Sequence, residues 1–194
     1  MTDASAVRLV VSDVDGTLVD RAKQITPGVA AAVARLRAAG LPFTIISARP
    51  RSGLMPIAET LAIDAPMGAF NGGTVFTRDG RVTCHHVVDR SVVEAAFAAA
   101  RGLAVDTWVF ADDLWYASTD VGAHVTSERI ASNQTPIVTQ DFSSLYDRVD
   151  KITFVSDVPT LLADLHASLE PHAAQATIAQ SQTYYLDITA LRAN

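Results

Sequence analysis

The chain contains 194 residues, of which 49% are hydrophobic and 19% are charged, and its formal net charge at pH 7 is −6. This composition predicts a globular protein with a substantial core, and the length allows one domain or two. The acidic balance and the lack of a Lys/Arg cluster argue against nucleic acid as a partner, because binding to a phosphate backbone needs concentrated positive charge.

The sequence also lacks the signals that direct a chain into or across a membrane. No stretch approaches the roughly eighteen uninterrupted apolar residues of a spanning helix, and the first residues do not have the pattern of a signal peptide. The single cysteine, Cys84, has no partner for an internal disulfide, which is typical of a reducing compartment. These observations predict a cytoplasmic protein without a membrane partner.

The first part of the chain alternates between short apolar runs and helical patterns. Thr26 and Pro27 are typical of the start of a helix, and Gly40 follows its end. A second helix is expected to end near Leu61, with Pro56 either in its first turn or producing a kink. The apolar runs, which have the pattern of strands covered on both faces, are residues 8–13, 41–47 and 66–73. This alternation predicts a parallel α/β sheet with helical crossovers.

After residue 73 the pattern becomes mixed. Asp79–Gly80 predicts a hairpin turn between two strands. Later strands are expected at 105–110, 114–118, 151–156, 174–180 and 183–189, helices at 91–102, 121–131 and 159–169, and a loop at 132–149. Asp157 or Ser156 is expected to cap the last of these helices. The pattern predicts a second, open-faced α+β layer that begins near residues 82–88.

Polar residues follow each of the three parallel strands. Asp13 and Asp15 come at the end of the first strand, Ser47 ends the second, and Asn71 follows the third. In such sheets ligands bind beyond the carboxyl ends of the strands, so these four side chains are expected to meet at one edge. They define the candidate site.

Asp13 and Asp15 have the chemistry that phosphoryl transfer needs. One carboxylate can attack phosphorus, while the other donates a proton to the leaving oxygen and later activates water. Gly16 permits close backbone approach, and its N–H and that of Thr17 are expected to point toward an anion. Mg²⁺ between a carboxylate and the phosphate would offset their mutual repulsion.

Ser47 and Arg49 could add a hydroxyl hydrogen bond and a planar cation to a phosphate site. Simpler interpretations stay open: Asp13 can cap a turn, Ser47 can be a turn or N-cap residue, and Arg49 can be an ordinary exposed arginine. A calcium loop is rejected, because an EF-hand requires glycine at its sixth position and glutamate at its twelfth. In this chain Gly16 is fourth and Gln24 is twelfth.

Four segments resemble motifs of the haloacid dehalogenase (HAD) superfamily, and in particular its Cof-type phosphatases of subfamily IIB. They are Asp13–Leu18 for the first motif, Ile45–Pro50 for the second, Phe70–Gly73 followed by Val75–Phe76 for a Cof-type loop, and Tyr185–Thr189 for the end of the cap. The resemblance implies an α/β fold with a Rossmann-like parallel-sheet core, incomplete at its C-terminus, and an inserted α+β cap. The expected boundaries are 1–82 for the core, 83–190 for the cap and 191–194 for the return to the core.

The same resemblance implies a Mg²⁺-dependent phosphatase that acts on sugar phosphates or similar small phosphorylated metabolites through an aspartyl-phosphate intermediate. Asp13 would be the nucleophile and a metal ligand. Asp15 would be the acid/base and would bind the metal through its backbone carbonyl. Ser47 would hold the transferring phosphoryl group, helped by backbone N–H groups around Asp15 and at Asn71–Gly72. The cap would close over the substrate and select it.

The sequence departs from this family pattern at two places. Ala48 stands where the family generally has glycine, and the chain stops at Asn194, before the lysine–glycine pair and acidic loop of the family. Neither Lys23, just after the first motif, nor Lys151, on a predicted cap strand, is expected to replace that lysine. The chain is therefore expected to be a fragment of a longer protein, weak or inactive by itself, with an unpaired sheet edge and exposed apolar faces.

Two other functions stay open at this point. A phosphomutase would hand the same phosphoryl group to another sugar oxygen instead of water. A non-catalytic module would bind a phosphorylated ligand without turnover and pair with a partner or a second copy through its exposed core edge. The sequence does not decide the oligomeric state.

Overall fold

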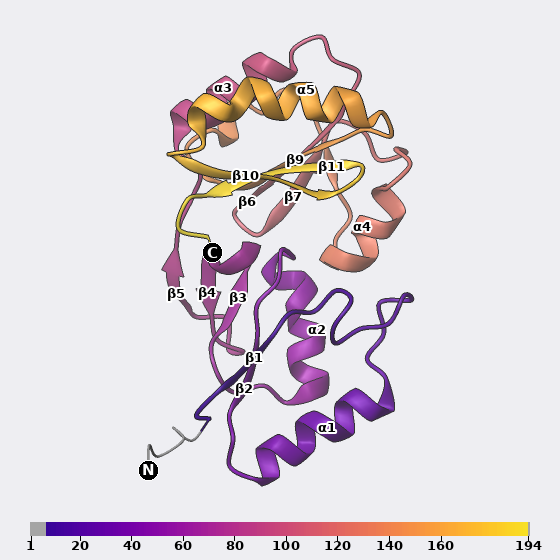
Figure 1. Cartoon of the computed structure of the whole chain (residues 1–194), viewed down its shortest axis with the longest axis vertical. Helices are drawn as coiled ribbons and strands as arrows, with labels where there is room; N and C mark the ends of the chain where they lie inside the picture. Colours follow the sequence, from indigo (N-terminus) through magenta and orange to yellow (C-terminus); the bar gives the residue numbers. More distant parts are fainter. Residues whose placement is uncertain (1–6, 194) are drawn as a thin grey trace, which may run out of the picture.

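The computed structural model describes residues 7–193, so the first six residues and Asn194, which the predicted domains include, lie outside it. Two layered regions are stacked in Figure 1: an N-terminal region of residues 7–86 and a C-terminal region of residues 87–190. The first has parallel strands with helical crossovers, and the second has a mainly antiparallel sheet. The α/β fold class expected from the sequence is confirmed.

The N-terminal region is built on a short parallel sheet. Its elements are β1 (Val10–Ser12), α1 (Pro27–Ala38), β2 (Phe43–Ile45), α2 (Arg51–Leu61) and β3 (Met67–Ala69). β1 and β2 pair in parallel, and a single parallel bridge between Ile46 and Gly68 joins β2 to β3. The predicted order of strand, helix, strand, helix and strand is therefore correct, with each strand shorter than its apolar run.

The helix signals act largely as expected. The Val29 N–H donates to Thr26 Oγ1 over 3.4 Å at the start of α1, and Pro27 is the first helical residue. Val33 is the buried centre of the apolar stripe. Pro56 lies in the middle of α2, beyond its first turn.

A hairpin follows β3 and leads to the C-terminal region. The short 3₁₀ helix η1 (Phe70–Gly72) precedes β4 (Thr74–Phe76) and β5 (Val82–His85), which pair in antiparallel fashion around the predicted turn. Gly80 has φ +85° there, a conformation that glycine adopts without strain. The boundary expected at residue 82 thus falls at the start of β5, a strand that pairs with the N-terminal region.

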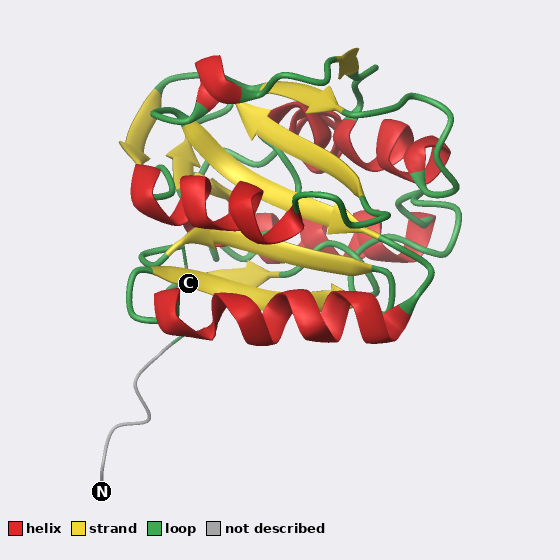
Figure 2. Ribbon diagram, turned by 90° about the horizontal axis from the view of Figure 1, so that it is seen from above, coloured by secondary structure: helices red, strands yellow, loops and turns green. Residues whose placement is uncertain are grey.

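The C-terminal region is a six-stranded sheet with two helices on one face. Its elements are α3 (Arg90–Ala100), β6 (Asp106–Ala111), β7 (Leu114–Ala117), α4 (Val125–Ser132), β8 (Ile137–Val138), η2 (Ser143–Leu145), β9 (Val149–Val155), α5 (Pro159–Leu169), η3 (Glu170–His172), β10 (Ala176–Gln182) and β11 (Tyr185–Ala190). The strand order is β10-β11-β9-β6-β7-β8, and only β7 and β8 are parallel. α3 and α5 cover the outer face, which is the view from above in Figure 2.

Three local predictions in this region are wrong. The loop expected at 132–149 contains β8 and η2. α4 begins at Val125, four residues later than expected. Residues 121–124 form bends and turns, in which Gly122 packs so closely that a Cβ there would clash with the Asp106 carboxylate. α5 has Val158 at its N-cap and no side-chain cap. Ser156 instead accepts the Val158 N–H over 3.2 Å before the helix begins.

The two faces of this sheet have different roles. Alternate residues of the strands, such as Val109, Ile152 and Leu186, join the helices in one apolar cluster. The intervening residues of β6, such as Trp108 and Phe110, join the core of the N-terminal region. The uncovered face of the sheet therefore lies over the N-terminal region, as Figure 1 shows.

α4 and α2 bring the two regions together beside this face. The Ser52 hydroxyl donates to the Ser132 carbonyl over 2.7 Å, and the Gln134 amide donates to Ser52 Oγ over 2.7 Å. Gly53 is buried so close to α4 that a Cβ at this position would clash with the Ala131 carbonyl oxygen. This close packing fixes the position of α4 above the carboxyl ends of the parallel strands.

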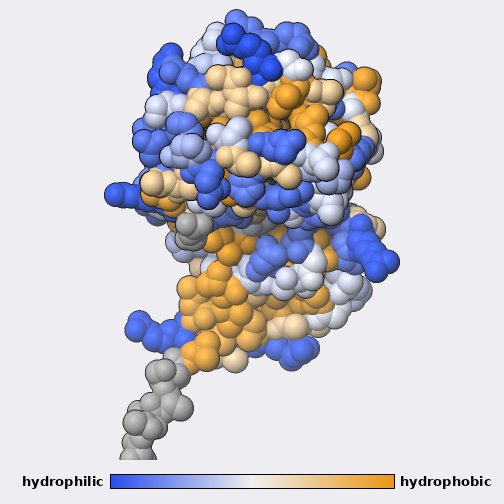
Figure 3. Space-filling model, turned by 45° about the horizontal axis from the view of Figure 1, so that its top comes forward, coloured by the Kyte–Doolittle hydropathy of each residue, from blue (hydrophilic) through white to orange (hydrophobic). Residues whose placement is uncertain are grey.

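The first strand has a pairing partner on one side only within residues 7–193. Val7, Leu9 and Val11 have exposed fractions of 67%, 45% and 54%, and apolar side chains gather on this part of the surface in Figure 3. An unpaired, apolar strand edge of this kind favours pairing with another strand. Within the described part of the chain, no helix combines the length and the hydropathy needed to cross a membrane.

Candidate active site

The three parallel strands bring their carboxyl ends to one edge, as the sequence predicts. The Ile46 N–H donates to the Ser12 carbonyl over 3.0 Å, and the Asn71 N–H donates to the Ser47 carbonyl over 2.8 Å. Asp13 follows Ser12 directly, so the backbone after β1 lies beside the backbone after β2, which lies beside that after β3. The candidate residues come from three separate segments.

Asp13 and Asp15 flank Val14, which is buried and starts a tight turn. The Val14 carbonyl accepts the Thr17 N–H over 3.3 Å, and Gly16 in the turn has φ +80°. The expectation that the Thr17 N–H points toward an anion is therefore wrong for this structure, because it already has a partner. The turn separates the two aspartates in exposure: Asp13 is exposed, whereas Asp15 is half-buried.

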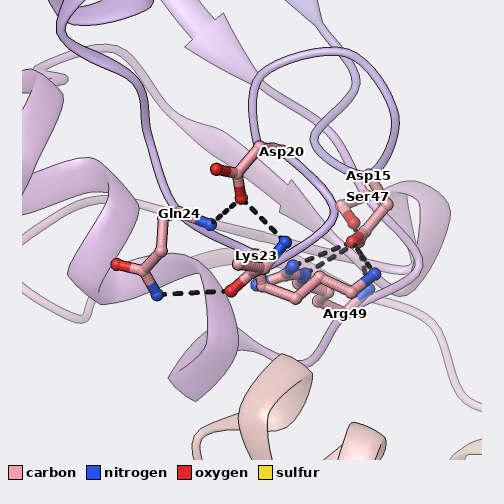
Figure 4. A network of polar contacts seen from close by, with 7 residues as sticks. Asp15, Asp20, Lys23, Gln24, Ser47 and Arg49 are labelled. Atoms are coloured by element: carbon pink, nitrogen blue, oxygen red, sulfur yellow. Dashed lines mark hydrogen bonds and ion pairs between the residues drawn. The ribbon is translucent and has the colours of Figure 1, made fainter.

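Two cations hold the Asp15 carboxylate, as Figure 4 shows. Arg49 donates from Nε to Oδ2 and from one terminal nitrogen to Oδ1, each over 2.8 Å, and Lys23 Nζ donates to Oδ1 over 2.6 Å. Burial alone would raise the pKa of Asp15, but the hydrogen bonds and charges of Arg49 and Lys23 outweigh it and lower this pKa to about 2. Asp15 is therefore ionised at neutral pH. Asp13 has no hydrogen bond or ion pair to its carboxylate within residues 7–193.

Arg49 is not the ordinary exposed arginine of the simpler interpretation, since its side chain is only 7% exposed. Its own backbone N–H donates to the Ser47 hydroxyl over 3.3 Å, which is the turn contact considered for that serine. Ser47 is buried, and Asn71 is exposed with a left-handed backbone at φ +58°. The Arg49 guanidinium thus pairs with the Asp15 carboxylate in this structure, although the sequence interpretation assigned it to phosphate binding.

Lys23 reaches the site through a turn that the sequence interpretation missed. The Asp20 carboxylate accepts the Ala22 and Gln24 N–H groups over 2.9 and 3.0 Å, and Lys23 between them has φ +61°. Aspartate is typical of such turns, because its side chain accepts backbone N–H groups a few residues further along the chain. Asp20 is therefore a signal that the sequence could have supplied. The sequence interpretation expected only that Lys23 would not replace the missing lysine of the family, and it did not foresee the contact of Lys23 with Asp15.

A pocket of about 260 Å³ separates this cluster from the sheet above it. Its charged lining comes from both regions: Asp15, Lys23 and Arg49 from below, and Glu128, Lys151 and Asp187 from above. Lys151 is buried, and its Nζ lies 3.4 Å from the Ala48 carbonyl of the second motif. Lys151 does lie on a strand of the upper sheet, as predicted, but this strand carries it into the candidate site.

The charged groups of the upper wall differ in how well they are paired. Asp187 accepts hydrogen bonds from the Thr153 and Ser181 hydroxyls, each over 2.6 Å, and lies 3.9 Å from Lys151 Nζ. The carboxyl group of Glu128, on α4, has no hydrogen bond or ion pair within residues 7–193. Burial raises the pKa of Glu128 to about 7, although the nearby Lys151 charge opposes this shift. The sequence interpretation missed Glu128, and no motif or spacing marks it.

The oxygen atoms near Asp13 fit a magnesium ion better than a metal that needs a full protein cage. Among residues 7–193 no group of three or more His, Cys, Asp and Glu side chains lies close enough to hold a metal. Mg²⁺ binds proteins through one or two carboxylates and completes its shell with waters and substrate phosphate. The unpaired Asp13 carboxylate and the neighbouring Asp15 carbonyl are donors of this type.

The sequence of the chain matches one protein family over most of its length and two curated proteins over about a third of it. A family model described as haloacid dehalogenase-like hydrolase matches residues 10–194. The pyridoxal phosphate phosphatase YbhA of Escherichia coli is 35% identical over 65 residues, which are 34% of this chain and 24% of that protein. A Haemophilus influenzae protein is 33% identical over 72 residues, which are 37% of this chain and 28% of that protein. The match spans about a quarter of the length of these curated relatives.

Solved structures share the fold over nearly the whole chain. A haloacid dehalogenase-like hydrolase from Bacteroides thetaiotaomicron has a TM-score of 0.85 at 21% identity, and the match covers 96% of this chain and 72% of that one. A sugar phosphatase of HAD subclass IIB has a TM-score of 0.76 at 18% identity, covering 94% of this chain and 70% of that one. At these identities the likeness concerns the fold.

Proposed function

The chain belongs to the haloacid dehalogenase-like hydrolase family, and we propose that its protein is a Mg²⁺-dependent phosphatase of small phosphomonoesters. Sugar phosphates and similar metabolites are the proposed substrates, and the cytoplasm is the proposed location. The observation that carries the proposal is the different setting of the two aspartates: Asp13 is exposed and unpaired, whereas Asp15 is held by two cations at the lower wall of the pocket. We also assign residues 1–82 to a core domain and 83–190 to a cap domain.

Asp13 is the proposed nucleophile. Its carboxylate oxygen attacks phosphorus, a bond to the phosphoryl group forms, and the bond from phosphorus to the leaving alcohol oxygen breaks. Ser47 would support the phosphoryl group through its hydroxyl, with the backbone N–H groups of Gly16 and Gly72, because the Asn71 N–H already donates to the Ser47 carbonyl. Water then attacks the aspartyl phosphate and releases inorganic phosphate.

Asp15 is the proposed acid and base, and its partners explain how its protonation can change. With a pKa of about 2 it cannot supply a proton at neutral pH. A bound phosphoryl group is an anion that competes for Arg49 and Lys23, so these cations hold the carboxylate less strongly. The pKa of Asp15 then rises, which allows it to protonate the leaving oxygen and afterwards to take a proton from water.

The Asp13 carboxylate and the Asp15 carbonyl would hold Mg²⁺. When bound there, the ion offsets the repulsion between the Asp13 carboxylate and the phosphate oxygens. The protein groups still do the binding and the proton transfer. Removal of Mg²⁺ with a chelator is expected to abolish phosphate release.

Replacement of Asp13 by Asn tests the proposal in the protein at its full natural length. The amide cannot form the aspartyl phosphate, so phosphate release from para-nitrophenyl phosphate is expected to fall at least about 10³-fold. Thermal stability should change little, because Asp13 is exposed and unpaired. Asp164→Asn, an exposed position on α5, is the matched control and should keep full activity. Full activity in Asp13→Asn would contradict the assignment of the nucleophile.

A further inference from the structure

Glu128 is the one charged group of the pocket lining whose side chain has no partner within residues 7–193. The Asp15 carboxylate has Arg49 and Lys23, and the Asp187 carboxylate has Thr153, Ser181 and the more distant Lys151. Glu128 lines the same cavity, yet no donor reaches its carboxyl oxygens. A half-buried carboxyl group without a donor costs free energy that a solvated one does not.

The fold holds Glu128 in this position. It lies in the first half of α4, and the other end of that helix is fixed to α2 through Ser132 and the close approach of Gly53. Figure 1 shows α4 between the edge of the upper sheet and the top of α2. The carboxyl group therefore cannot leave the pocket by a movement of α4 without breaking the contact between the two regions.

The opposite wall shows which part of a substrate would reach Glu128. The cations Arg49 and Lys23 line the lower wall, and the proposed nucleophile Asp13 is two residues from Asp15 of that wall, so the phosphoryl group is expected to bind at this end. The alcohol part of a phosphomonoester then extends toward the upper wall. Ser127, Ser181 and Gln182 line the same pocket as Glu128, together with the aromatic side chains of Tyr184 and Tyr185.

We propose that Glu128 determines substrate specificity by accepting a hydrogen bond from a hydroxyl or ammonium group on the alcohol part of the substrate. The inference rests on the proposed phosphatase function and narrows it: the preferred substrates are polyol, sugar or amino-alcohol phosphates, and phosphate esters without such a donor are poor substrates. A site that is built to hydrogen-bond a substrate group discriminates strongly against analogues that lack it.

A purely structural role for Glu128 makes a different prediction. An acidic residue near the start of a helix also stabilises the helix dipole, by about 0.3–1 kcal/mol at exposed positions. In that case its replacement would lower stability and would change the turnover of all substrates alike. The two roles are separated by comparing substrates with and without a donor.

The test measures kcat/KM for glycerol phosphate, ethanolamine phosphate and para-nitrophenyl phosphate with the protein at its full natural length. The first carries hydroxyl groups, the second an ammonium group, and the third neither. Glu128→Ala is expected to lower kcat/KM at least about tenfold for whichever donor-bearing substrate the pocket prefers, and to change it less than about twofold for para-nitrophenyl phosphate. The preferred substrate of the wild type identifies the donor as hydroxyl or ammonium.

Two further variants complete the experiment. Glu128→Gln keeps the side-chain volume but loses the charge. Its kcat/KM for an ammonium substrate should therefore fall as much as in Glu128→Ala, and its kcat/KM for a hydroxyl substrate should fall less. Glu59→Gln, an exposed position on α2, is the matched control and should change none of the three values. Circular dichroism of each variant checks that the fold is intact.

Three outcomes would overturn the inference. One is an equal fall for all three substrates, and another is no change in Glu128→Ala for the donor-bearing substrates. The third is a wild type that prefers para-nitrophenyl phosphate to both. A wild type that hydrolyses none of them in the presence of Mg²⁺ would instead overturn the proposed phosphatase function, and the specificity role would fall with it.

Discussion

Asp15 and Glu128 line opposite walls of one pocket, and the two walls treat their carboxyl groups in opposite ways. On the lower wall, Arg49 and Lys23 lower the pKa of Asp15 to about 2. On the upper wall, burial without a partner raises the pKa of Glu128 to about 7. Burial raises the pKa of both groups, but within residues 7–193 only Asp15 has donors, Arg49 and Lys23, whose hydrogen bonds and charges reverse the shift.

The carboxylate of Asp15 finds its partners within the chain, whereas the carboxyl group of Glu128 leaves a partner to be supplied by a ligand. On the lower wall the Asp15 carboxylate is paired with the wall's own cations before anything binds. The upper wall retains an acceptor without a donor. In an enzyme, the first arrangement suits groups that act on every substrate, and the second suits a group that distinguishes among substrates.

Replacement of Arg49 by Met should break the balance of the lower wall and have the largest effect on stability. It removes a buried cation with two hydrogen bonds to Asp15, so the free energy of unfolding at pH 7 is expected to fall by about 2–3 kcal/mol. This value is below that for fully buried pairs, because the Asp15 side chain is 36% exposed. Urea unfolding measures the effect, and Arg35→Met, an exposed position on α1, should change stability by less than about 0.5 kcal/mol.

The pH dependence of this variant checks the cause. The folded-state pKa of Asp15 is below its ordinary value of 3.8, so its pairing stabilises the protein above that value and the contribution is lost as pH falls toward about 2. The stability difference between wild type and Arg49→Met should therefore shrink over this acidic range. A difference that stays constant down to pH 2 would show that the pairing with Asp15 is not its source.

Glu128→Gln should have a smaller effect on stability and one of opposite sign. The folded-state pKa of Glu128 is above its ordinary value of 4.5, so the wild type loses stability as pH rises from 4.5 through about 7. Lys151 and Arg49 favour the charged form, whereas Asp187 and Asp15 disfavour it. Above pH 7 the variant is expected to be more stable than wild type by about 1–2 kcal/mol, since the open pocket weakens the burial effect. Thermal unfolding from pH 4 to 8 measures this, and parallel curves for the two proteins would contradict it.

The sequence predicts the fold well because its signals are local. Alternating apolar runs and helix caps such as Thr26 and Pro27 determine the order of elements in the first region. The Asp79–Gly80 turn likewise places a hairpin correctly. The predictions fail at the ends of two helices: residues 121–124, where Gly122 packs against Asp106, form turns before α4, and Ser156 accepts a backbone N–H before α5 instead of capping it.

The sequence predicts only the lower part of the site, whose residues belong to recognisable motifs at the ends of the parallel strands. The strand-end rule brings Asp13, Ser47 and Asn71 to one edge from sequence alone. It cannot place Lys151 or Glu128, because these residues reach the pocket only through the stacking of the upper sheet and α4 on the lower region. Whether the assigned residues carry out catalysis stays a prediction until the variants are measured.

Lys23→Met should have the smallest effect and should sharpen the comparison within the lower wall itself. Lys23 donates one hydrogen bond to Asp15 and is 31% exposed, whereas Arg49 donates two and is 7% exposed. An exposed ion pair typically contributes less than about 1 kcal/mol, and salt screens it. Urea unfolding should therefore show a loss below about 1 kcal/mol that decreases further in high salt, while the loss in Arg49→Met persists. If the two variants lost equal stability in high salt, burial and bidentate geometry would not explain how Asp15 is held, and the contrast with Glu128 would need another cause.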